Sequence, residues 1–456
     1  MQNQDKAITI EQGLKAEVFR ALVALSIPTI LEEILATLLQ YVDTAMVGRL
    51  GETATASVSV TTTVTWLINS VSSALAVAAL SLIAKAVGSG DGKRIQRLSS
   101  QVLVLAVGCG LIMGGISMLL SPYIPVWMGA EESIQGQASL YFFIVSIPMV
   151  FRSCNSILGA SIRATKDTRT PMLINLSANI LNVALNYLMI YTLGLGVTGA
   201  AIASAISYAL SGSCMFLAYR RNRLLYWRFG TFSLDAPILR DCARLSIPVL
   251  GTNIASCLGY VVFASLVTGM GNTIFAAHSI AVTAETIFYI PGYGLRTATS
   301  ALVGNALGEG NQKKFELVGG MSVMLTMGMM VISGLILYFA AYPLMSLFTN
   351  SVRVATIGSQ MLKLVAFSEP FFGLMVVMEG IFYGLGRTRY TFFVETFSMW
   401  GVRILMTYVC VRIWGLGLQE VWYCMIADNV CKAVLLTIPV MNKKYREKLF
   451  PIPPAA

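Results

Sequence analysis

Twelve long apolar stretches, separated by short polar or Gly/Pro-rich breaks, limit what this 456-residue chain can fold into. Each is long enough to cross the hydrocarbon core of a bilayer, which takes about 20 apolar residues in a helix. The stretches are 18–42, 53–83, 98–120, 138–162, 171–193, 196–219, 239–267, 275–305, 318–341, 360–385, 391–412 and 416–440. The second and eighth are long enough to be tilted or bent. We therefore predict an all-α integral membrane protein with twelve transmembrane helices.

The composition argues against several other classes of protein. Only 12% of the residues are charged, about half of what a soluble domain carries, so we do not expect a soluble enzyme, a secreted module or a disordered scaffold. The net charge of +10 comes from Lys and Arg residues that lie between apolar runs and form no basic face. We therefore expect a lipid bilayer, and no nucleic acid, as the environment of this chain.

The distribution of Lys and Arg predicts the orientation, because positively charged loops stay on the cytoplasmic side. With the N-terminus inside, 23 basic residues fall on the cytoplasmic side, and the opposite side has only Arg49, Arg353, Lys363 and Arg412. The first 20 residues lack the pattern of a cleavable signal peptide. We predict a multi-pass protein of the inner or plasma membrane with both termini in the cytoplasm.

The two halves of the sequence match at an offset of 220 residues. "LSIP" at 25–28 recurs at 245–248, "VGSGDGKRIQRL" at 87–98 aligns with "LGEGNQKKFELV" at 307–318, and "TR" at 168–169 recurs at 388–389. Each half holds six spans and starts on the same side of the membrane, as in transporters built from parallel repeats. We predict an N-lobe at 1–219, a cytoplasmic linker at 220–238 and a C-lobe at 239–456, with a substrate site between the lobes.

Four segments together resemble the multidrug and toxic compound extrusion (MATE) family over the whole chain. They are "LSIP…VDTAMVGRLG", "VGSGD", "LGASIRATKDTRTP" and "LNYLMIYTLGLGVTGAAIASAIS". The resemblance, to the DinF-like branch of the family, implies two pseudo-symmetric six-helix bundles around a central cleft. It also implies a monomeric secondary active exporter, an antiporter that moves small organic, cationic or amphipathic compounds outward against an inward flow of Na⁺ or H⁺.

Polar side chains inside the first six spans predict a cation site. Asp43 is a carboxylate near the end of the first span, and Asn175, Asn179, Asn182 and Asn186 recur at intervals of 4, 3 and 4, which places them on one helix face. Alternatively, Asp43 lies at the headgroups and the amides only join helices. Oxygen atoms from amides around one carboxylate suit a hard cation. At the repeat offset Phe263 stands opposite Asp43, so this chemistry is confined to the first half.

The resemblance assigns roles to individual residues of this site. It implies that Asp43, Asn155 on the fourth span, Asn182 on the fifth and Ser204 on the sixth bind the coupling cation, and they are the candidate Na⁺ ligands. Asn186 stands where relatives carry a second Asp, which lowers the negative charge and leaves the choice between Na⁺ and H⁺ open. The NorM-like branch keeps an acid in the seventh span. Residues 245–267 contain none, which argues against that branch.

Other acids inside the spans are candidates for contacting a substrate, because a charge in hydrocarbon costs about 2.5–3.5 kcal/mol. Glu32 lies nearly on the face of Asp43, either as a relay or substrate-facing acid or as a protonated carboxyl hydrogen-bonded to a neighbouring helix. We expect the pairs Glu285–Arg296, Asp428–Lys432 and Glu395–Arg403 to neutralise each other, and no local partner for Glu369 or Glu379. The substrate-cavity candidates are Glu32, Glu33, Asn179, Glu285 and Glu369.

Prolines inside the spans are predicted flex points, since each frees a carbonyl and allows bending. Pro28 and Pro248, at equivalent positions of the two halves, are the candidate hinges, and Pro148, Pro291 and Pro370 also interrupt spans.

Three other functions fit the sequence less well than export. A lipid-linked precursor flippase of the same wider superfamily would favour a more cationic cavity, and a channel would form a symmetric pore between subunits. A membrane enzyme would need clustered catalytic or metal-binding residues, but His278 is the only histidine and the eight cysteines lack metal-ligand spacing. No phosphate-binding loop for ATP is present. We therefore expect no cofactor beyond the coupling ion.

Overall fold

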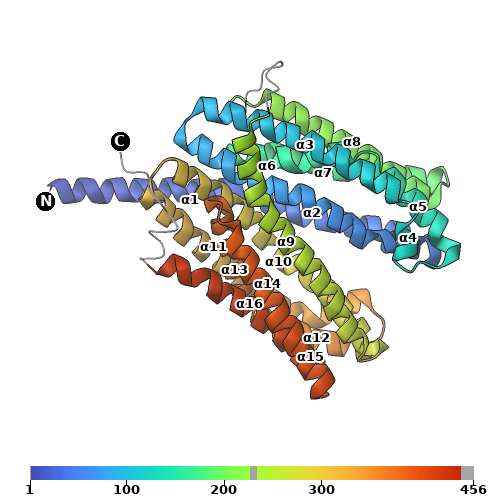
Figure 1. Cartoon of the computed structure of the whole chain (residues 1–456). Coiled ribbons are helices and arrows are strands. Elements are labelled where there is room, and N and C mark those ends of the chain that lie inside the picture. Colours follow the sequence, from blue (N-terminus) through green and yellow to red (C-terminus); the bar gives the residue numbers. More distant parts are fainter. Residues whose placement is uncertain (1, 226–233, 443–456) are drawn as a thin grey trace. The chain divides into compact units, whose positions relative to one another are not determined.

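The computed structural model describes residues 2–225 and 234–442, and in this part every regular element is a helix (Figure 1). In chain order they are α1 (Gln2–Gly48), α2 (Glu52–Ser89), α3 (Gly92–Leu120), α4 (Ile124–Trp127), α5 (Glu132–Ser146), α6 (Met149–Ala164), α7 (Arg169–Asn186), η1 (Tyr187–Thr192), α8 (Gly196–Arg221), α9 (Ala236–Thr268), α10 (Asn272–Gly308), α11 (Gln312–Phe348), α12 (Val352–Ala366), α13 (Glu369–Leu385), α14 (Thr388–Phe397), η2 (Ser398–Ile404), α15 (Leu405–Tyr408), η3 (Val409–Ile413) and α16 (Leu418–Met441). The elements η1, η2 and η3 are π-helical.

These helices account for the twelve predicted spans. In the described part, nine are long and apolar enough to cross a membrane: α1, α2, α3, α7 with η1, α8, α9, α10, α11 and α16. Two more spans are bent pairs, α5 with α6 and α12 with α13. The last, 391–412, is the continuous run from α14 to η3, which has Glu395 and Arg403 in its interior. The predicted all-α membrane fold is confirmed.

The sharp bends lie in spans four and ten, whereas the long spans two and eight are single helices. The angle between α5 and α6 is 50°, and that between α12 and α13 is 56°. Pro148 immediately precedes α6, and Pro370 is the second residue of α13; a proline ring clashes with the carbonyl four residues earlier and ends the preceding helix. Pro28 and Pro248 lie inside the continuous helices α1 and α9, so their role as hinges stays a prediction.

The sequence repeat corresponds to a repeat of helices. Four helices start 220 residues before a counterpart: α2 and α10 at Glu52 and Asn272, α3 and α11 at Gly92 and Gln312, α5 and α12 at Glu132 and Val352, and α6 and α13 at Met149 and Glu369. Even the proline-associated bend is present in both halves. The duplication therefore extends from sequence to backbone geometry.

The matching "VGSGD" and "LGEGN" segments form the same turn. Gly90 and Gly310 have φ angles of 67° and 65°, a left-handed conformation that glycine adopts without a steric penalty. The next residues cap the following helices: Asp91 accepts a hydrogen bond from the Arg94 amide at 3.0 Å, and Asn311 accepts one from the Lys314 amide at 2.9 Å. Side-chain caps of this kind fix where a helix begins.

The chain forms two compact units. Leu31–Leu250 make up one, called the N unit here, and Met1–Ile30 with Gly251–Ala456 make up the other, the C unit. Helices α1 and α9 contribute to both. The predicted lobes at 1–219 and 239–456 place these boundaries differently, and they stay a prediction. Residues 226–233 of the predicted linker and the basic tail from 443 onward, which carry part of the charge count used for orientation, lie outside the described residues.

Each unit has its own apolar core. In the C unit, Val18 and Leu22 of α1 pack with buried residues of α10, α11, α13 and α16. A second cluster surrounds Phe263 and Trp422. In the N unit, Val47 at the end of α1 packs with Ile190 and Ala200. The two ends of the first helix are therefore anchored in different cores.

Helix α1 approaches α10 most closely beside Pro28. The Thr29 hydroxyl donates a hydrogen bond to the Gly294 carbonyl at 2.8 Å. A Cβ atom on Gly294 would lie 2.6 Å from the Ile30 amide nitrogen and 2.7 Å from its Cα. Because these are backbone atoms, no side-chain rotation could relieve the clash, and only glycine allows this approach.

We therefore predict that Gly294→Ala destabilises the protein by about 1–3 kcal/mol, the usual cost of overpacking a tight interior. Thermal unfolding of the purified protein in detergent, followed by size-exclusion chromatography, measures the effect. Gly328→Ala on α11 is the matched control, because nothing lies within 4 Å of its Cβ position. Equal melting temperatures for the two variants would contradict the assigned α1–α10 contact.

Candidate functional site

Asp43 on α1 and Asn186 on α7 are in direct contact in the N unit. The Asn186 side-chain amide donates a hydrogen bond to Asp43 Oδ1. Asn186 is completely buried, whereas Asp43 is half-buried. The end of α1 is also joined to η1, since the Tyr191 hydroxyl donates to the Met46 carbonyl at 2.9 Å. Asp43 thus lies against a neighbouring helix, in a polar environment inside the unit.

The contact continues into a chain of polar side chains. The same Asn186 amide nitrogen lies 3.2 Å from Asn182 Oδ1, and the Asn182 amide donates to Ser204 Oγ on α8 at 3.3 Å. One hydrogen-bonded series therefore links α1, α7 and α8. Four of the five predicted cation-coupling residues belong to it, and the predicted amide face of the fifth span supplies its centre.

Asn155, the fifth of these residues, is on α6 and outside this hydrogen-bonded series. Its Oδ1 atom is buried and accepts no hydrogen bond in the described part of the chain, and the same holds for Asn186 Oδ1. A buried oxygen without a donor is costly. Two amide oxygens, one on α6 and one on α7, are therefore available to a cation, in addition to the Asp43 carboxylate.

Tyr141 on α5 is a residue near Asp43 that the sequence analysis missed. It packs on the cluster formed by Val47, Ile190 and Ala200, and it is close enough to Asp43 for their charges to interact. No other described side chain interacts electrostatically with Asp43, apart from Asn186 and Tyr141. A tyrosine inside an apolar run gives no sequence signal, because aromatic residues are common in membrane helices.

Glu32 contacts two neighbouring helices. Glu32 Oε1 accepts hydrogen bonds from Arg163 Nη2 at the end of α6, at 2.6 Å, and from the Asn175 amide of α7, at 2.5 Å. Glu32 is bound to neighbouring helices, as one of the two alternatives predicts, but it is bound in an ion pair with Arg163 and not as the protonated carboxyl of that prediction. Glu33 is exposed and Asn179 is half-buried.

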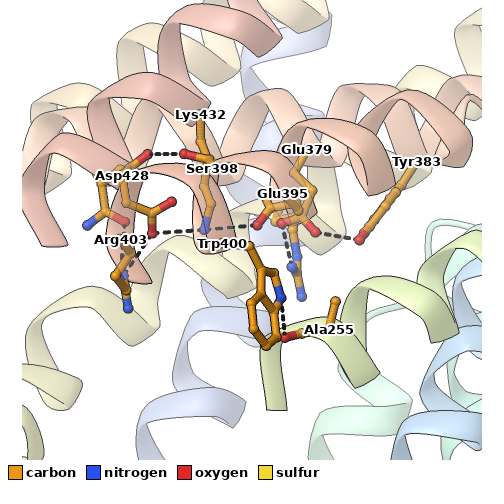
Figure 2. Close-up of polar contacts among 11 residues, drawn as sticks. Ala255, Glu379, Tyr383, Glu395, Ser398, Trp400, Arg403, Asp428 and Lys432 are labelled. Atoms are coloured by element: carbon orange, nitrogen blue, oxygen red, sulfur yellow. Dashed lines mark hydrogen bonds and ion pairs between the residues drawn. The ribbon is translucent and has the colours of Figure 1, made fainter. Parts of the chain in front are cut away.

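The C unit contains buried ion pairs instead of a carboxylate–amide series (Figure 2). Lys432 Nζ on α16 lies 3.2 Å from Glu395 Oε2 and 3.1 Å from Asp428 Oδ2. The same Asp428 oxygen lies 2.9 Å from Arg403 Nε on η2. Separately, Arg296 on α10 contacts Glu379 on α13 at 2.7 Å. Three acids and three bases take part, so their charges balance, which is the condition for burying ions at acceptable cost.

Two of the predicted ion pairs are wrong. Arg296 pairs with Glu379, which also accepts a hydrogen bond from Tyr383, and not with Glu285. Arg403 pairs with Asp428, because η2 has more residues per turn than an α-helix and rotates Arg403 away from the face of Glu395. The pair Asp428–Lys432, at i and i+4 on a regular helix, is confirmed.

Glu285 and Glu369 are the remaining acids inside the C unit. They are 7% and 1% exposed, and they are close enough for their charges to interact. Neither carboxylate oxygen of Glu369 has a hydrogen-bond partner in the described residues. Burying an ionised carboxyl without a partner is expensive. The C unit therefore has two acids in excess of its ion pairs.

The described residues contain no group of three or more His, Cys, Asp or Glu side chains that could hold a metal ion. The arrangement around Asp43, with one carboxylate and several neutral oxygens, is instead suited to a weakly bound monovalent cation or a proton.

Comparison with known proteins gives the family. The MatE family model matches residues 28–188 and 248–409, that is, one segment in each half. A "Probable multidrug resistance protein NorM" from Thermotoga maritima is 26% identical over 437 residues, covering 95% of this chain and 94% of that protein. A "Probable multidrug resistance protein YpnP" from Bacillus subtilis is 25% identical over 406 residues, covering 88% and 90%.

Solved structures share the fold. A MOP superfamily transporter from Pyrococcus furiosus superimposes with a TM-score of 0.88 at 22% identity, over 96% of this chain and 97% of that one. The Vibrio cholerae MATE transporter VcmN in the bent form gives 0.87 at 18% identity, over 96% and 98%. With a family match in both halves and the same twelve-span fold, this chain belongs to the MatE family of membrane transporters.

Proposed function

We propose that this protein is a secondary active multidrug exporter, which couples the inward movement of Na⁺ or H⁺ to the export of organic cationic or amphipathic compounds. The relatives in Thermotoga maritima and Bacillus subtilis carry the name of multidrug resistance proteins, which supports the class of substrate. The coupling ion is a transported co-substrate and not a resident cofactor. The observation that carries the proposal is the environment of Asp43.

Asp43 is the carboxylate best placed to bind an exchangeable cation. Its hydrogen-bond partner, Asn186, is neutral, and no Lys or Arg of the described chain interacts with it. The other acid in the interior of the same unit, Glu32, already has a cationic partner. Because an unpaired carboxylate in a membrane interior is unfavourable, Asp43 gains more than Glu32 from an incoming ion.

The surrounding oxygens favour this proposal. Oδ1 of Asn155 and Oδ1 of Asn186 are buried without a donor, and Asn182 and Ser204 complete the polar series. An arriving Na⁺ would be held by these oxygens and the carboxylate, and an arriving proton by the carboxylate alone. Both remove a negative charge from the contact between α1 and α7.

Neutralising Asp43 weakens the charge-assisted hydrogen bond from Asn186, which is worth about 1.5–3 kcal/mol while Asp43 is ionised. Loss of this contact frees the part of α1 around Asp43 from α7, whereas Glu32 stays bound to Asn175 and residues before Ile30 stay packed in the C unit. We infer that the resulting movement of α1, with Pro28 and Pro248 as hinges, narrows the substrate site and drives export.

Candidates for contacting a cationic substrate are Glu285 and Glu369, the buried acids outside the ion pairs, although Arg403 is close enough to interact with the charge of Glu285. Glu33 and Asn179 are further candidates. The parallel course of α1 and α7, shown by the two contacts between them, agrees with odd-numbered spans crossing in one direction. We propose a monomer in the inner or plasma membrane with both termini in the cytoplasm.

Replacing Asp43 tests the cation site. We predict that Asp43→Asn abolishes ethidium efflux and drug resistance in an efflux-deficient bacterial host, because the site then resembles its neutralised state at every pH and sodium concentration. Glu11→Gln is the matched control: it changes a carboxylate to an amide on the same helix, at an exposed position where Glu11 pairs with Lys15, and should keep wild-type efflux. Full resistance of Asp43→Asn at equal expression would refute the assignment.

The coupling ion is identified in inverted membrane vesicles with Na⁺ and H⁺ gradients imposed separately. We expect one of the two gradients to drive ethidium transport and the same gradient to be ineffective with Asp43→Asn. If the variant still responds to the gradient that drives the wild type, the ion binds elsewhere, and Glu369 becomes the next residue to replace.

A further inference from the structure

Helices α1 and α7 are joined by two contacts of the same construction. In each, an acid on α1 accepts a hydrogen bond from an asparagine amide on α7: Glu32 from Asn175, and Asp43 from Asn186. The acids are eleven residues apart, and so are the asparagines. Eleven residues are close to three helical turns, about 16 Å along the axis, so both contacts lie on the same pair of helix faces.

The two contacts differ in one component. At Glu32, the Arg163 guanidinium donates to the same carboxylate oxygen as the asparagine, at 2.6 Å, and the two side chains are only 15% and 11% exposed. Asp43 forms no ion pair with a Lys or Arg of the described residues, and the cation in this neighbourhood, Arg152, interacts with Tyr141. Glu32 is therefore paired with a cationic side chain of the protein itself, and Asp43 is not.

The position of Arg163 favours a permanent charge. It lies in the last turn of α6, where the unpaired carbonyls at the helix end stabilise a cation. A guanidinium stays protonated at every physiological pH. The nearby acid of the α6–α7 loop, Asp167, accepts a hydrogen bond from the Thr170 amide at 3.0 Å, and Glu33, next to Glu32, is exposed.

We propose that Arg163 fills a second carboxylate–amide cation site at Glu32 and thereby limits the N unit to one exchangeable cation. Glu32 is then a positioning residue that holds α1 on α6 and α7, while Asp43 exchanges its ion. This inference rests on the proposed function only in taking Asp43 as the exchangeable site. At the repeat offset, Thr252 and Tyr383 replace Glu32 and Arg163, so the filled site is confined to one half.

The test is the number of cations that the purified protein binds in detergent. Bound Na⁺ is measured by equilibrium dialysis with radioactive sodium at fixed pH, and bound H⁺ by potentiometric titration of the same samples. Arg163→Gln should bind one cation more than the wild type, because Glu32 then lacks the guanidinium of Arg163 as its cationic partner. Glu32→Gln/Arg163→Gln should return to the wild-type number, and Arg163→Lys should stay there.

Asn175→Asp gives an independent route if Arg163→Gln cannot be purified as a folded protein. It leaves Arg163 in place and adds a second carboxylate to the contact, so it also should bind one additional cation. Wild-type stoichiometry in Arg163→Gln, or in Asn175→Asp if Arg163→Gln does not fold, would overturn the inference.

The Asp43→Asn background separates this inference from the proposed function. If Asp43→Asn binds as many cations as the wild type, Asp43 is not the exchangeable site. The gain caused by Arg163→Gln in that background still decides whether Arg163 fills the site at Glu32.

Discussion

The cost of placing charge inside a membrane protein controls the polar architecture of both units. An isolated ion there is unfavourable by several kcal/mol, so each acid needs a cation, a neutral donor or a proton. In the N unit, Glu32 takes an arginine and Asp43 takes only an amide. In the C unit, three acids are matched by three bases. Within the N unit, this contrast supports the proposal that an ion from outside the protein completes the charge balance at Asp43, and in the C unit Glu285 and Glu369 lie outside the ion pairs.

The two halves therefore share a backbone and differ in their electrostatics. Helix starts, capped turns and proline bends recur at an offset of 220 residues. The polar positions do not: Phe263 stands opposite Asp43, and Glu395 stands opposite Asn175. The duplicated scaffold therefore holds a carboxylate–amide contact in one half and ion pairs in the other, which agrees with the proposal of an exchangeable site in the first half alone.

Local regularities of the sequence were enough to predict much of this. Span number and the shared face of Asn182 and Asn186 follow from hydrophobic length and helix periodicity, which depend on neighbouring residues alone, and the repeat follows from matching the two halves of the sequence. The Asp428–Lys432 pair was predictable for the same reason. Arg163 with Glu32, and Arg296 with Glu379, join residues far apart in sequence, so their pairing depends on tertiary packing. Glu395 and Arg403 were mispaired because the π-helical turns of η2 change the angle between successive residues.

The equal spacing of the two contacts between α1 and α7 has a mechanical consequence. Both acids and both asparagines are eleven residues apart. Sliding α1 by one turn would therefore move both acids away from their asparagine partners, and both hydrogen bonds would be lost together. The two hydrogen bonds together therefore oppose movement of α1 along its axis. If only the contact between Asp43 and Asn186 is lost, the contact between Glu32 and Asn175 remains. The part of α1 beyond Glu32 can then swing while the helix keeps its position along its axis.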